Sequence, residues 1–138
     1  MEKASFQFVS YRFTKAFLDF LIPREAELAI CFNPTGVFNA KEHRYVLSFD
    51  IDVNCEETKS TIVNVTCEAS FSFEGHITIE EIPEYFYPNS LAIVFPYVRA
   101  FISTLTLQAN ISPVVLPTIN LVGLTDKLKQ QTTVLPQE

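Results

Sequence analysis

The chain has 138 residues, a formal net charge of −6 and a hydrophobic fraction of 48%. This length fits one ordinary domain, and an acidic balance without a basic run argues against a nucleic-acid partner, whose phosphates require clustered Lys and Arg. Glycine supplies only 3 residues and phenylalanine 13. Glycine-dependent phosphate loops and dinucleotide folds are therefore disfavoured, and the phenylalanine surplus either fills a dense core or is there to be contacted.

The cysteines and the first residues of the chain indicate a reducing cytoplasm. The three cysteines are odd in number and include no C-x-x-C pair, which argues against a disulfide scaffold. Residues 1–20 lack the continuous apolar stretch of a signal peptide. Residues 91–98 are continuously apolar, but Arg99 follows them and a membrane span needs about 20 such residues, so no membrane insertion is expected.

The first predicted elements are two strands. The aromatic residues of segment 6–13 change phase at residues 9–10, which predicts a bent edge strand with a β-bulge at that point. An apolar connection, 17–23, follows. Alternation over residues 27–33 predicts a second strand that ends or bulges at Pro34.

Two longer strands come next. Residues 44–55 alternate between apolar and polar, and residues 60–74 do the same, as expected where one face of a sheet is buried and the other is wet. The polar link 56–59 is short, so the two strands are predicted to form an antiparallel hairpin. Three predicted core residues fall on the inward phase, namely Phe49, Phe71 and Phe73.

The last third of the chain changes to a helical period. A helix is predicted from Asn89 or Ser90 to about Ala109, with a kink or a late start at Pro96. Residues 112–117 contain two prolines and are predicted to form an extended crossover. A short amphipathic helix with leucines three and four residues apart ends near Gln131.

These elements predict an α+β fold, with a four-stranded antiparallel sheet and a long helix and a short C-terminal helix on one face. Residues 1–131 are expected to form a single domain, and residues 132–138 a flexible tail. Residues 91–107 are apolar around most of the helix circumference and must be covered on several sides. Because one sheet covers only one side, an oligomer is expected.

No constellation of residues supports an enzyme, and neither a metal nor a cofactor is expected. His43 and His76 have no partners at a zinc-site spacing. Cys67 falls on the inward phase of its strand, where a small buried hydrophobe is a better interpretation than a nucleophile. A solvated turn before the helix explains Glu80, Glu81 and Glu84 better than acid–base chemistry does.

Residues 71–121 carry a series of motifs in a fixed order. A strand ends in Phe71-Ser-Phe-Glu-Gly75, the long helix carries Phe95-Pro-Tyr-Val-Arg99, and the crossover ends in Leu116-Pro-Thr-Ile-Asn-Leu121. This order resembles the protein-export chaperone family SecB, in which a Phe-rich strand end leads to a Pro-Asn helix start, a Phe-Pro-Tyr-x-Arg helix and a short C-terminal helix.

The resemblance implies a homotetramer, a dimer of dimers, that holds unfolded or export-bound polypeptides without ATP. It also implies apolar client grooves formed by the crossover after the first strand, the second strand and the C-terminal helix. The corresponding positions for client binding are Phe17, Phe20, Leu21, Ile22, Leu28, Ile30, Phe32, Leu121, Leu124 and Leu128. The positions expected at the oligomer interface are Phe6, Phe8, Phe95, Tyr97, Arg99, Phe101, Ile102 and Leu105. Promiscuous binding of unfolded chains requires such exposed apolar surface together with free strand edges.

More than one partner and more than one pathway are compatible with this resemblance. In the SecB family an acidic sheet surface docks the translocation motor SecA, but Ala16 and Asn64 stand where two of those acids are expected, so SecA docking is less well supported than client binding. A SecB-like chaperone of a toxin–antitoxin system fits equally well, and a small apolar-ligand carrier is the alternative from a different class. Client binding predicts that Phe17, Phe20 and Phe32 are at least partly exposed.

Overall fold

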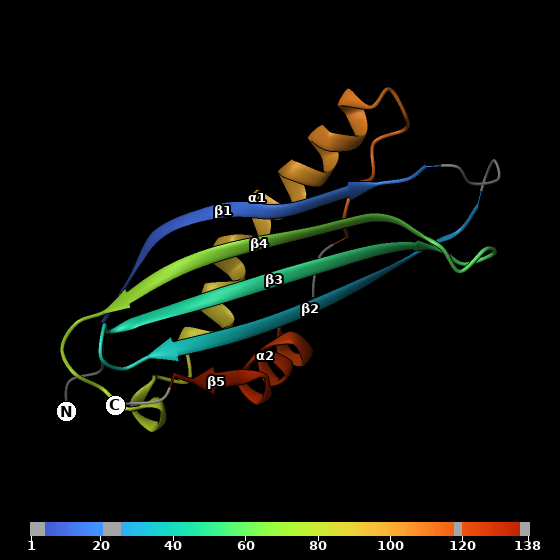
Figure 1. Ribbon diagram of the computed structural model, residues 1–138. Coiled ribbons are helices and arrows are strands. Elements are labelled where there is room, and N and C mark those ends of the chain that lie inside the picture. Colours follow the sequence, from blue (N-terminus) through green and yellow to red (C-terminus); the bar gives the residue numbers. More distant parts are fainter. Residues whose placement is uncertain (1–4, 21–25, 118–119, 136–138) are drawn as a thin grey trace.

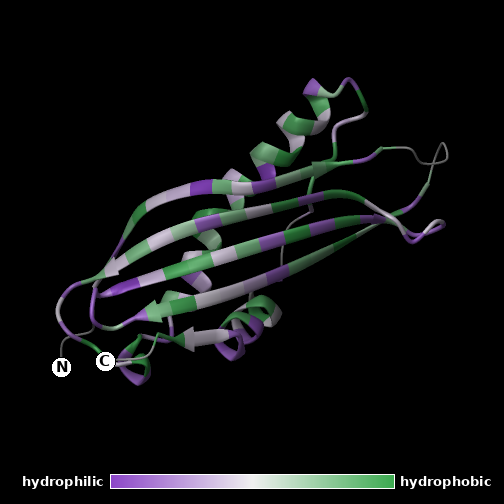
Figure 2. Ribbon diagram, in the orientation of Figure 1, coloured by the Kyte–Doolittle hydropathy of each residue, from purple (hydrophilic) through white to green (hydrophobic). Residues whose placement is uncertain are grey.

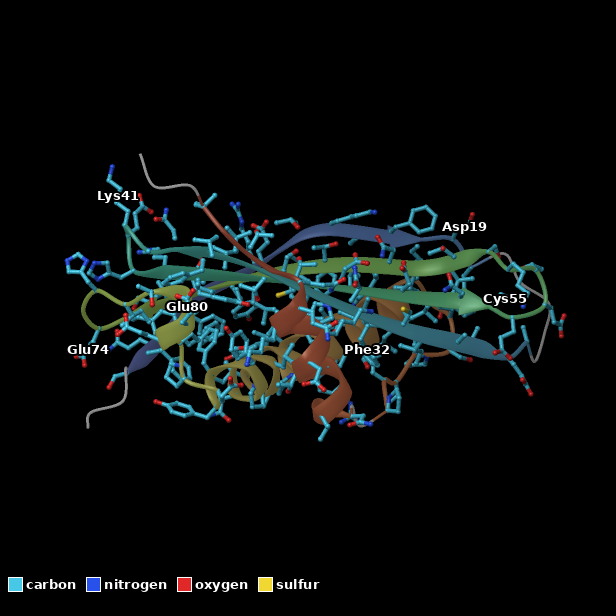
Figure 3. The ribbon with its side chains drawn as sticks, turned by 90° about the horizontal axis from the view of Figure 1, so that it is seen from below. Asp19, Phe32, Lys41, Cys55, Glu74 and Glu80 are labelled. Carbon is cyan, nitrogen blue, oxygen red and sulfur yellow. The ribbon has the colours of Figure 1, made fainter. Side chains whose placement is uncertain are left out.

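The computed structural model describes residues 5–20, 26–117 and 120–135. A sheet carries both helices on one of its faces, as the two views in Figures 1 and 3 show. The strands are β1 Phe6–Leu18, β2 Leu28–Asn39, β3 Arg44–Cys55, β4 Thr61–Phe73 and β5 Thr132–Val134. The helices are the 3-10 turn η1 Ile79–Glu81, α1 Phe86–Gln108 and α2 Leu121–Gln130. The strand order is β1-β4-β3-β2-β5, and β5 alone runs parallel to its neighbour.

The α+β class and the placement of the two helices agree with the sequence prediction, but the sheet has five strands instead of four. The tail that was expected to be loose from residue 132 begins with β5, which pairs with β2 at Gly36–Phe38. The Tyr45 hydroxyl lies 2.6 Å from the Thr132 hydroxyl, and Leu135 N donates to Phe38 O at 3.0 Å. A three-residue strand is too short to show a period, so tertiary pairing alone decides its conformation.

The core lies between the sheet and α1. β3 and β4 alternate between buried and partly exposed residues along almost their whole length, and Figure 2 shows the matching alternation of hydrophobic and hydrophilic residues. Phe49 and Phe71 are fully buried and Phe73 is 4% exposed, as predicted for core residues. Period-two patterning predicted these two strands well because one face of each is buried and the other is wet.

Two irregularities bend β1 at the edge of the sheet. Its pairing with β4 slips between Phe8 and Ser10, at the predicted bulge, and slips again between Phe13 and Lys15. Each slip reverses which residues face the helices. After the second slip, Phe17 pairs with Asn64 and lies on the face that carries no helix.

α1 begins earlier than predicted. Its first residue is Phe86, and Tyr85 occupies the N-cap without a side-chain hydrogen bond. Phe86 is fully buried and Tyr87 is 3% exposed, so core packing extends the helix beyond the capping residues that the sequence offers. Pro88 is tolerated in the first turn, where no intrahelical N–H bond is required. The helix continues through Pro96 to Gln108.

Among the described residues, α1 is long and apolar enough by composition to cross a membrane. It instead packs on the sheet through a stripe of residues three and four apart. That stripe consists of Leu91, Val94, Val98, Ile102 and Thr106, all buried. Only 39% of its most apolar 18-residue window is buried, however. The chain therefore leaves much of the apolar surface of α1 uncovered.

The crossover after α1 is held against that helix. Thr106 Oγ1 accepts a hydrogen bond from Val114 N at 2.9 Å, and Ser103 Oγ donates to Val114 O at 3.2 Å. Val114 and Leu116 are buried while Val115 is 61% exposed. This alternation fits the extended conformation predicted for residues 112–117 and brings the chain back to the start of α2.

Candidate functional site

The edge of β2 that faces away from β3 is covered in two different ways. β5 pairs with it at Gly36–Phe38. Earlier along the strand, Lys127 Nζ donates to Phe32 O at 3.0 Å and Gln131 Nε2 donates to Pro34 O at 2.6 Å. These two side chains lie at the end of α2 and just beyond it, so they attach the C-terminal helix to the edge of the sheet.

The first part of the same edge is open. Backbone N–H and C=O groups alternate in direction along a strand, so those of Leu28 and Ile30 point the same way as the carbonyl of Phe32. In the part of the chain that the structure describes, the only strand beyond this edge is β5, and its pairing does not reach these residues. The open groups can therefore accept hydrogen bonds from, and donate them to, another extended chain.

Apolar side chains lie directly beside this open edge. Leu28, Ile30 and Phe32 are half-buried and pack against the core from the second strand. The ring centroid of Phe32 is 6.1 Å from that of Phe49 and 6.0 Å from that of Phe95, and Figure 3 shows Phe32 on the helix side of the sheet near α2. Backbone groups and accessible apolar surface thus occur at the same place.

α2 supplies the other side of this region. Asn120 caps it by accepting hydrogen bonds from Val122 N at 3.1 Å and Gly123 N at 3.5 Å. Leu124 is half-buried and is available in part. Leu128 is fully buried in the core, so its predicted place in a client groove is wrong for this conformation, because the inner face of α2 packs it against the rest of the molecule.

The predicted client-binding residues do not form a single surface. Phe17 is 42% exposed, and Phe20 and Phe32 are half-buried, so all three have the exposure that was expected. Phe17, however, lies on the opposite face of the sheet from Phe32, because of the second irregularity in β1. Leu21 and Ile22 lie outside the described residues, as does the side chain of Leu121.

A second apolar surface is formed between β1 and α1. We call it the aromatic patch, and it consists of Tyr11, Phe13, Tyr97 and Phe101. The rings of Tyr11 and Tyr97 stack at 4.2 Å and those of Phe13 and Phe101 at 4.0 Å. Tyr11 remains 42% exposed and Tyr97 38%. Figure 1 shows the C-terminal part of α1 extending past β1 at this edge of the sheet.

The residues predicted for an oligomer interface differ in their access to solvent. Arg99 and Tyr97 are exposed, and five others are half-buried, namely Phe6, Phe8, Phe95, Phe101 and Leu105. Ile102 is fully buried against its own chain. Its assignment to an interface is therefore wrong for this structure, because it belongs to the stripe of α1 that faces the sheet.

The groups considered for catalysis have structural roles. Burial raises the pKa of the Cys67 thiol to about 11, with a smaller contribution from the charge of Glu68, so the thiol stays protonated and is a poor nucleophile. Glu81 accepts a hydrogen bond from Thr78 N at 2.9 Å in the η1 turn. Glu84 forms an ion pair with Lys129 of α2. These contacts agree with the interpretation of the acidic residues as part of a turn.

Sequence reasoning missed three contacts. Lys127 and Gln131 were not recognised, because a polar residue on a helix carries no signal for a distant backbone carbonyl. His43 and His76 are 33 residues apart, yet their Nε2 and Nδ1 atoms lie 2.9 Å from one another.

In residues 5–20, 26–117 and 120–135, no group of three His, Cys, Asp or Glu side chains is placed to hold a metal.

A comparison with known families identifies the fold. The family model described as preprotein translocase subunit SecB matches residues 25–132. The chain belongs to the SecB family. The match includes β2, both helices and the first residue of β5, and therefore the elements that form the open β2 edge.

Two individual proteins extend the comparison. An uncharacterized protein of Methanocaldococcus jannaschii is 48% identical over 52 residues, which are 38% of this chain and 34% of that protein. The chain thus covers about a third of this curated relative. The solved structure of the SecB-like chaperone Rv1957 of Mycobacterium tuberculosis, in complex with a ChAD peptide from the HigA1 antitoxin, matches with a TM-score of 0.69, 16% identity, and coverage of 83% of this chain and 88% of that one. At this identity the match establishes a shared SecB-like fold.

Proposed function

We propose that this protein is an ATP-independent chaperone that holds unfolded polypeptides as extended segments. The observation that carries the proposal is the open edge of β2 at Leu28 and Ile30, beside half-buried apolar side chains. Backbone hydrogen bonds to an edge strand are independent of client sequence, and an apolar surface accepts many different side chains. Membership of the SecB family and the peptide-bound neighbour Rv1957 support this role.

Self-association is part of the same proposal. The aromatic patch and the partly exposed surface of α1 are apolar surfaces that a second copy of the chain would cover. A second copy that covers this area gives a dimer, and two dimers give the tetramer expected for the family. Several weak client sites on one assembly then bind a long unfolded chain with avidity.

The holding activity can be measured by light scattering. A test client that aggregates on dilution from denaturant should stay soluble when this protein is present in stoichiometric amount, and added ATP should make no difference. Aggregation that continues unchanged, or that stops only with ATP, would contradict the proposal. Size-exclusion chromatography supplies the second measurement, because a client-binding tetramer elutes at about four times the 15.7 kDa of one chain.

The open edge can be tested with a matched pair of variants. Ile30→Pro removes the outward-pointing N–H of β2 and blocks strand addition, while proline is tolerated at a strand edge. Ile30→Val keeps the N–H and a similar apolar shape. We expect Ile30→Pro to lose most client binding and Ile30→Val to retain it, provided that both unfold at similar temperatures. Equal binding by the two variants would place the client elsewhere.

Rv1957 favours a second version of this function, in which the client is an antitoxin. Fluorescence anisotropy with an unfolded antitoxin peptide and an unfolded export precursor would separate the two versions by affinity. Both versions place the protein in the cytoplasm. A monomer that binds a fluorescent lipid and leaves unfolded chains unbound would instead support the apolar-ligand carrier.

A further inference from the structure

Two histidines that the proposed function does not use lie together at one end of the sheet. His43 ends the turn between β2 and β3, and His76 follows the end of β4 by three residues. Nε2 of His43 lies 2.9 Å from Nδ1 of His76, and the two ring centroids are 4.1 Å apart. Figure 3 labels Lys41 and Glu74, which are near them in the sequence, at this same end of the molecule.

The backbone brings the two histidines together. Phe73 N, at the end of β4, donates a hydrogen bond to His43 O at 2.8 Å. Gly75 has a φ of +77°, which glycine adopts without strain, and it turns the chain between β4 and His76. His43 has a φ of +56°, in a region that histidine tolerates better than most residues with a side chain. The closeness of the imidazoles therefore rests on the backbone as well as on their side-chain conformations.

Both rings can present a lone pair at the place where they meet. A neutral imidazole carries one N–H and one lone pair, on different nitrogens, so one of the two facing nitrogens donates and the other accepts. When the shared hydrogen moves to the far nitrogen of its own ring, both facing nitrogens carry a lone pair. His76 is exposed and His43 is half-buried, so the far N–H groups can donate to water. The change of tautomer leaves no buried donor without an acceptor.

The separation of the two nitrogens fits a metal ion. Imidazole nitrogens bind divalent transition metals at about 2.0–2.1 Å, so two of them at neighbouring corners of a square or an octahedron are about 2.9 Å apart. At the same bond length, two corners of a tetrahedron are about 3.3 Å apart. The observed 2.9 Å therefore matches the geometry that Cu²⁺ and Ni²⁺ prefer more closely than the tetrahedral geometry of Zn²⁺.

We propose that His43 and His76 chelate a divalent transition-metal ion and that Cu²⁺ binds most tightly. The affinity of nitrogen ligands rises from Ni²⁺ to Cu²⁺ and falls again at Zn²⁺. Water completes the coordination, since the described residues include no group of three metal-binding side chains. The bound ion joins the β2–β3 turn to the segment after β4. It therefore stabilises the folded chain relative to the unfolded one, in which 33 positions separate the two ligands.

The surroundings of the pair do not oppose a cation. The residues that flank it in the sequence supply two acids, Glu42 and Glu74, and two bases, Lys41 and Arg44, so their charges balance. The exposed thiol of Cys31 is a competing ligand for the same ions. The measurements therefore use the full chain with Cys31→Ala and without added histidines.

Calorimetric titration of this Cys31→Ala chain with NiCl₂, and in parallel with CuCl₂ and ZnCl₂, tests the proposal. We expect one ion per chain, the lowest Kd for Cu²⁺, and nitrogen couplings in the EPR spectrum of the Cu²⁺ complex. Loss of a residue that only hydrogen-bonds to a metal ligand weakens metal affinity about 10–100-fold, so His76→Asn, which removes a ligand, should weaken it at least about tenfold. At an ion concentration about 100 times the Kd, the melting temperature should rise by about 5 °C or more relative to EDTA.

Matched variants separate this site from other binding. Asparagine keeps a polar side chain and tolerates the left-handed backbone of His43, so His43→Asn provides a second variant that should lose affinity. Equal melting temperatures in EDTA show that the variants are folded. Asp126→Asn, at an exposed acid of α2, should leave binding of all three ions unchanged.

The proposal is overturned if the Cys31→Ala chain shows neither heat nor a thermal shift with any of the three ions. It is also overturned if His43→Asn and His76→Asn together bind the ions as tightly as that chain does, which would make the binding adventitious. None of these readouts involves a client, so the metal site and the chaperone role stand or fall separately.

Discussion

Gly36 makes room for a buried tyrosine that holds the last strand in place. A Cβ atom at Gly36 would lie 1.9 Å from the hydroxyl oxygen of Tyr45. Tyr45 is fully buried, and its hydroxyl is hydrogen-bonded to Thr132 at 2.6 Å. The absence of a side chain at one position of β2 therefore decides whether β5 can be attached to the sheet.

Gly36→Ala should reduce the free energy of unfolding by about 2–4 kcal/mol, because the ring must move and its hydrogen bond is lost. Gly123→Ala is the matched control. Nothing lies within 4 Å of a Cβ at Gly123, inside α2, so alanine there should raise stability by about 0.5–1 kcal/mol. Urea unfolding measures both. Equal stability of the two variants would mean that Tyr45 is not confined as described.

Cys67 should make the stability of the protein depend on alkaline pH. Burial raises its pKa from 9.0 to about 11, so the folded chain keeps a proton that the unfolded chain releases. Stability is then fully present below pH 9 and is lost as the pH rises toward 11. Burial also raises the pKa of the Tyr45 hydroxyl, which adds to the loss at the upper end.

Chemical unfolding at several pH values checks this sign. Cys67→Ala should lose less stability than the wild type between about pH 9 and pH 11, by up to about 3 kcal/mol. Cys31→Ala, at an exposed cysteine of β2, should follow the wild-type curve. If the free energy of unfolding of Cys67→Ala fell with pH as steeply as that of the wild type, the thiol would have the same pKa in the folded and unfolded states, contrary to this prediction.

At the level of elements, strands and helices that follow from a local sequence pattern could be predicted. Features that depend on contacts between residues far apart in the chain could not. The β3–β4 hairpin and the first bulge of β1 follow from alternation, because aromatic residues mark the phase. The second slip in β1 lies between Phe13 and Lys15. No change in the aromatic pattern indicates it there, because Thr14, Lys15 and Ala16 are acceptable on either face of the sheet. Phe17, which the family resemblance grouped with residues of β2, therefore lies on the other side of the sheet.

The candidate site was predicted only in part, for the same reason. Leu28, Ile30 and Phe32 could be placed on one face of β2 from their spacing. The open and covered parts of the β2 edge depend instead on α2 and β5, which contact β2 from about a hundred residues further along the chain. Neither the Lys127 hydrogen bond nor the pairing of β5 has a local pattern.

The attachment of α2 to β2 should limit client binding. Lys127→Met keeps the apolar stem of the side chain and removes the donor that occupies Phe32 O, so a client strand no longer competes with it. If the open edge is the client site, affinity for an unfolded peptide should rise about 2–10-fold, which corresponds to one hydrogen bond. Fluorescence anisotropy measures this. Lys129→Met, whose ammonium pairs with Glu84 instead, should bind as the wild type does, and unchanged affinity in both variants would contradict a role for Lys127.

For the whole molecule, accessible apolar surface occurs in two separate places. One suits the proposed client binding and the other the proposed self-association. The open β2 edge lies at one side of the sheet, and the aromatic patch lies at the other, between β1 and α1. A copy of the chain that covers the patch therefore leaves the β2 edge free. Assembly and client binding can occur together in this geometry.

If the aromatic patch is the interface of the proposed oligomer, Tyr97→Glu should dissociate that oligomer, because a carboxylate placed against the stacked ring of Tyr11 is costly to desolvate. Val122→Glu is the control, since Val122 is a 76% exposed hydrophobic residue on α2, away from the patch. Light scattering coupled to size exclusion should give a mass near 15.7 kDa for the first variant and the wild-type mass for the second. An unchanged mass for Tyr97→Glu would exclude the patch as the interface.

The parallel pairing of β5 with β2 also has a consequence for biosynthesis. β2 ends at Asn39 and β5 begins at Thr132, so β2 can pair with β3 long before its other neighbour, β5, has been synthesised. Pairings between such distant segments form late and leave apolar edges exposed in the meantime. The side of β2 that β5 covers is thus open on the nascent chain, and under the proposed holding activity finished copies of the protein would bind this edge until β5 pairs with it.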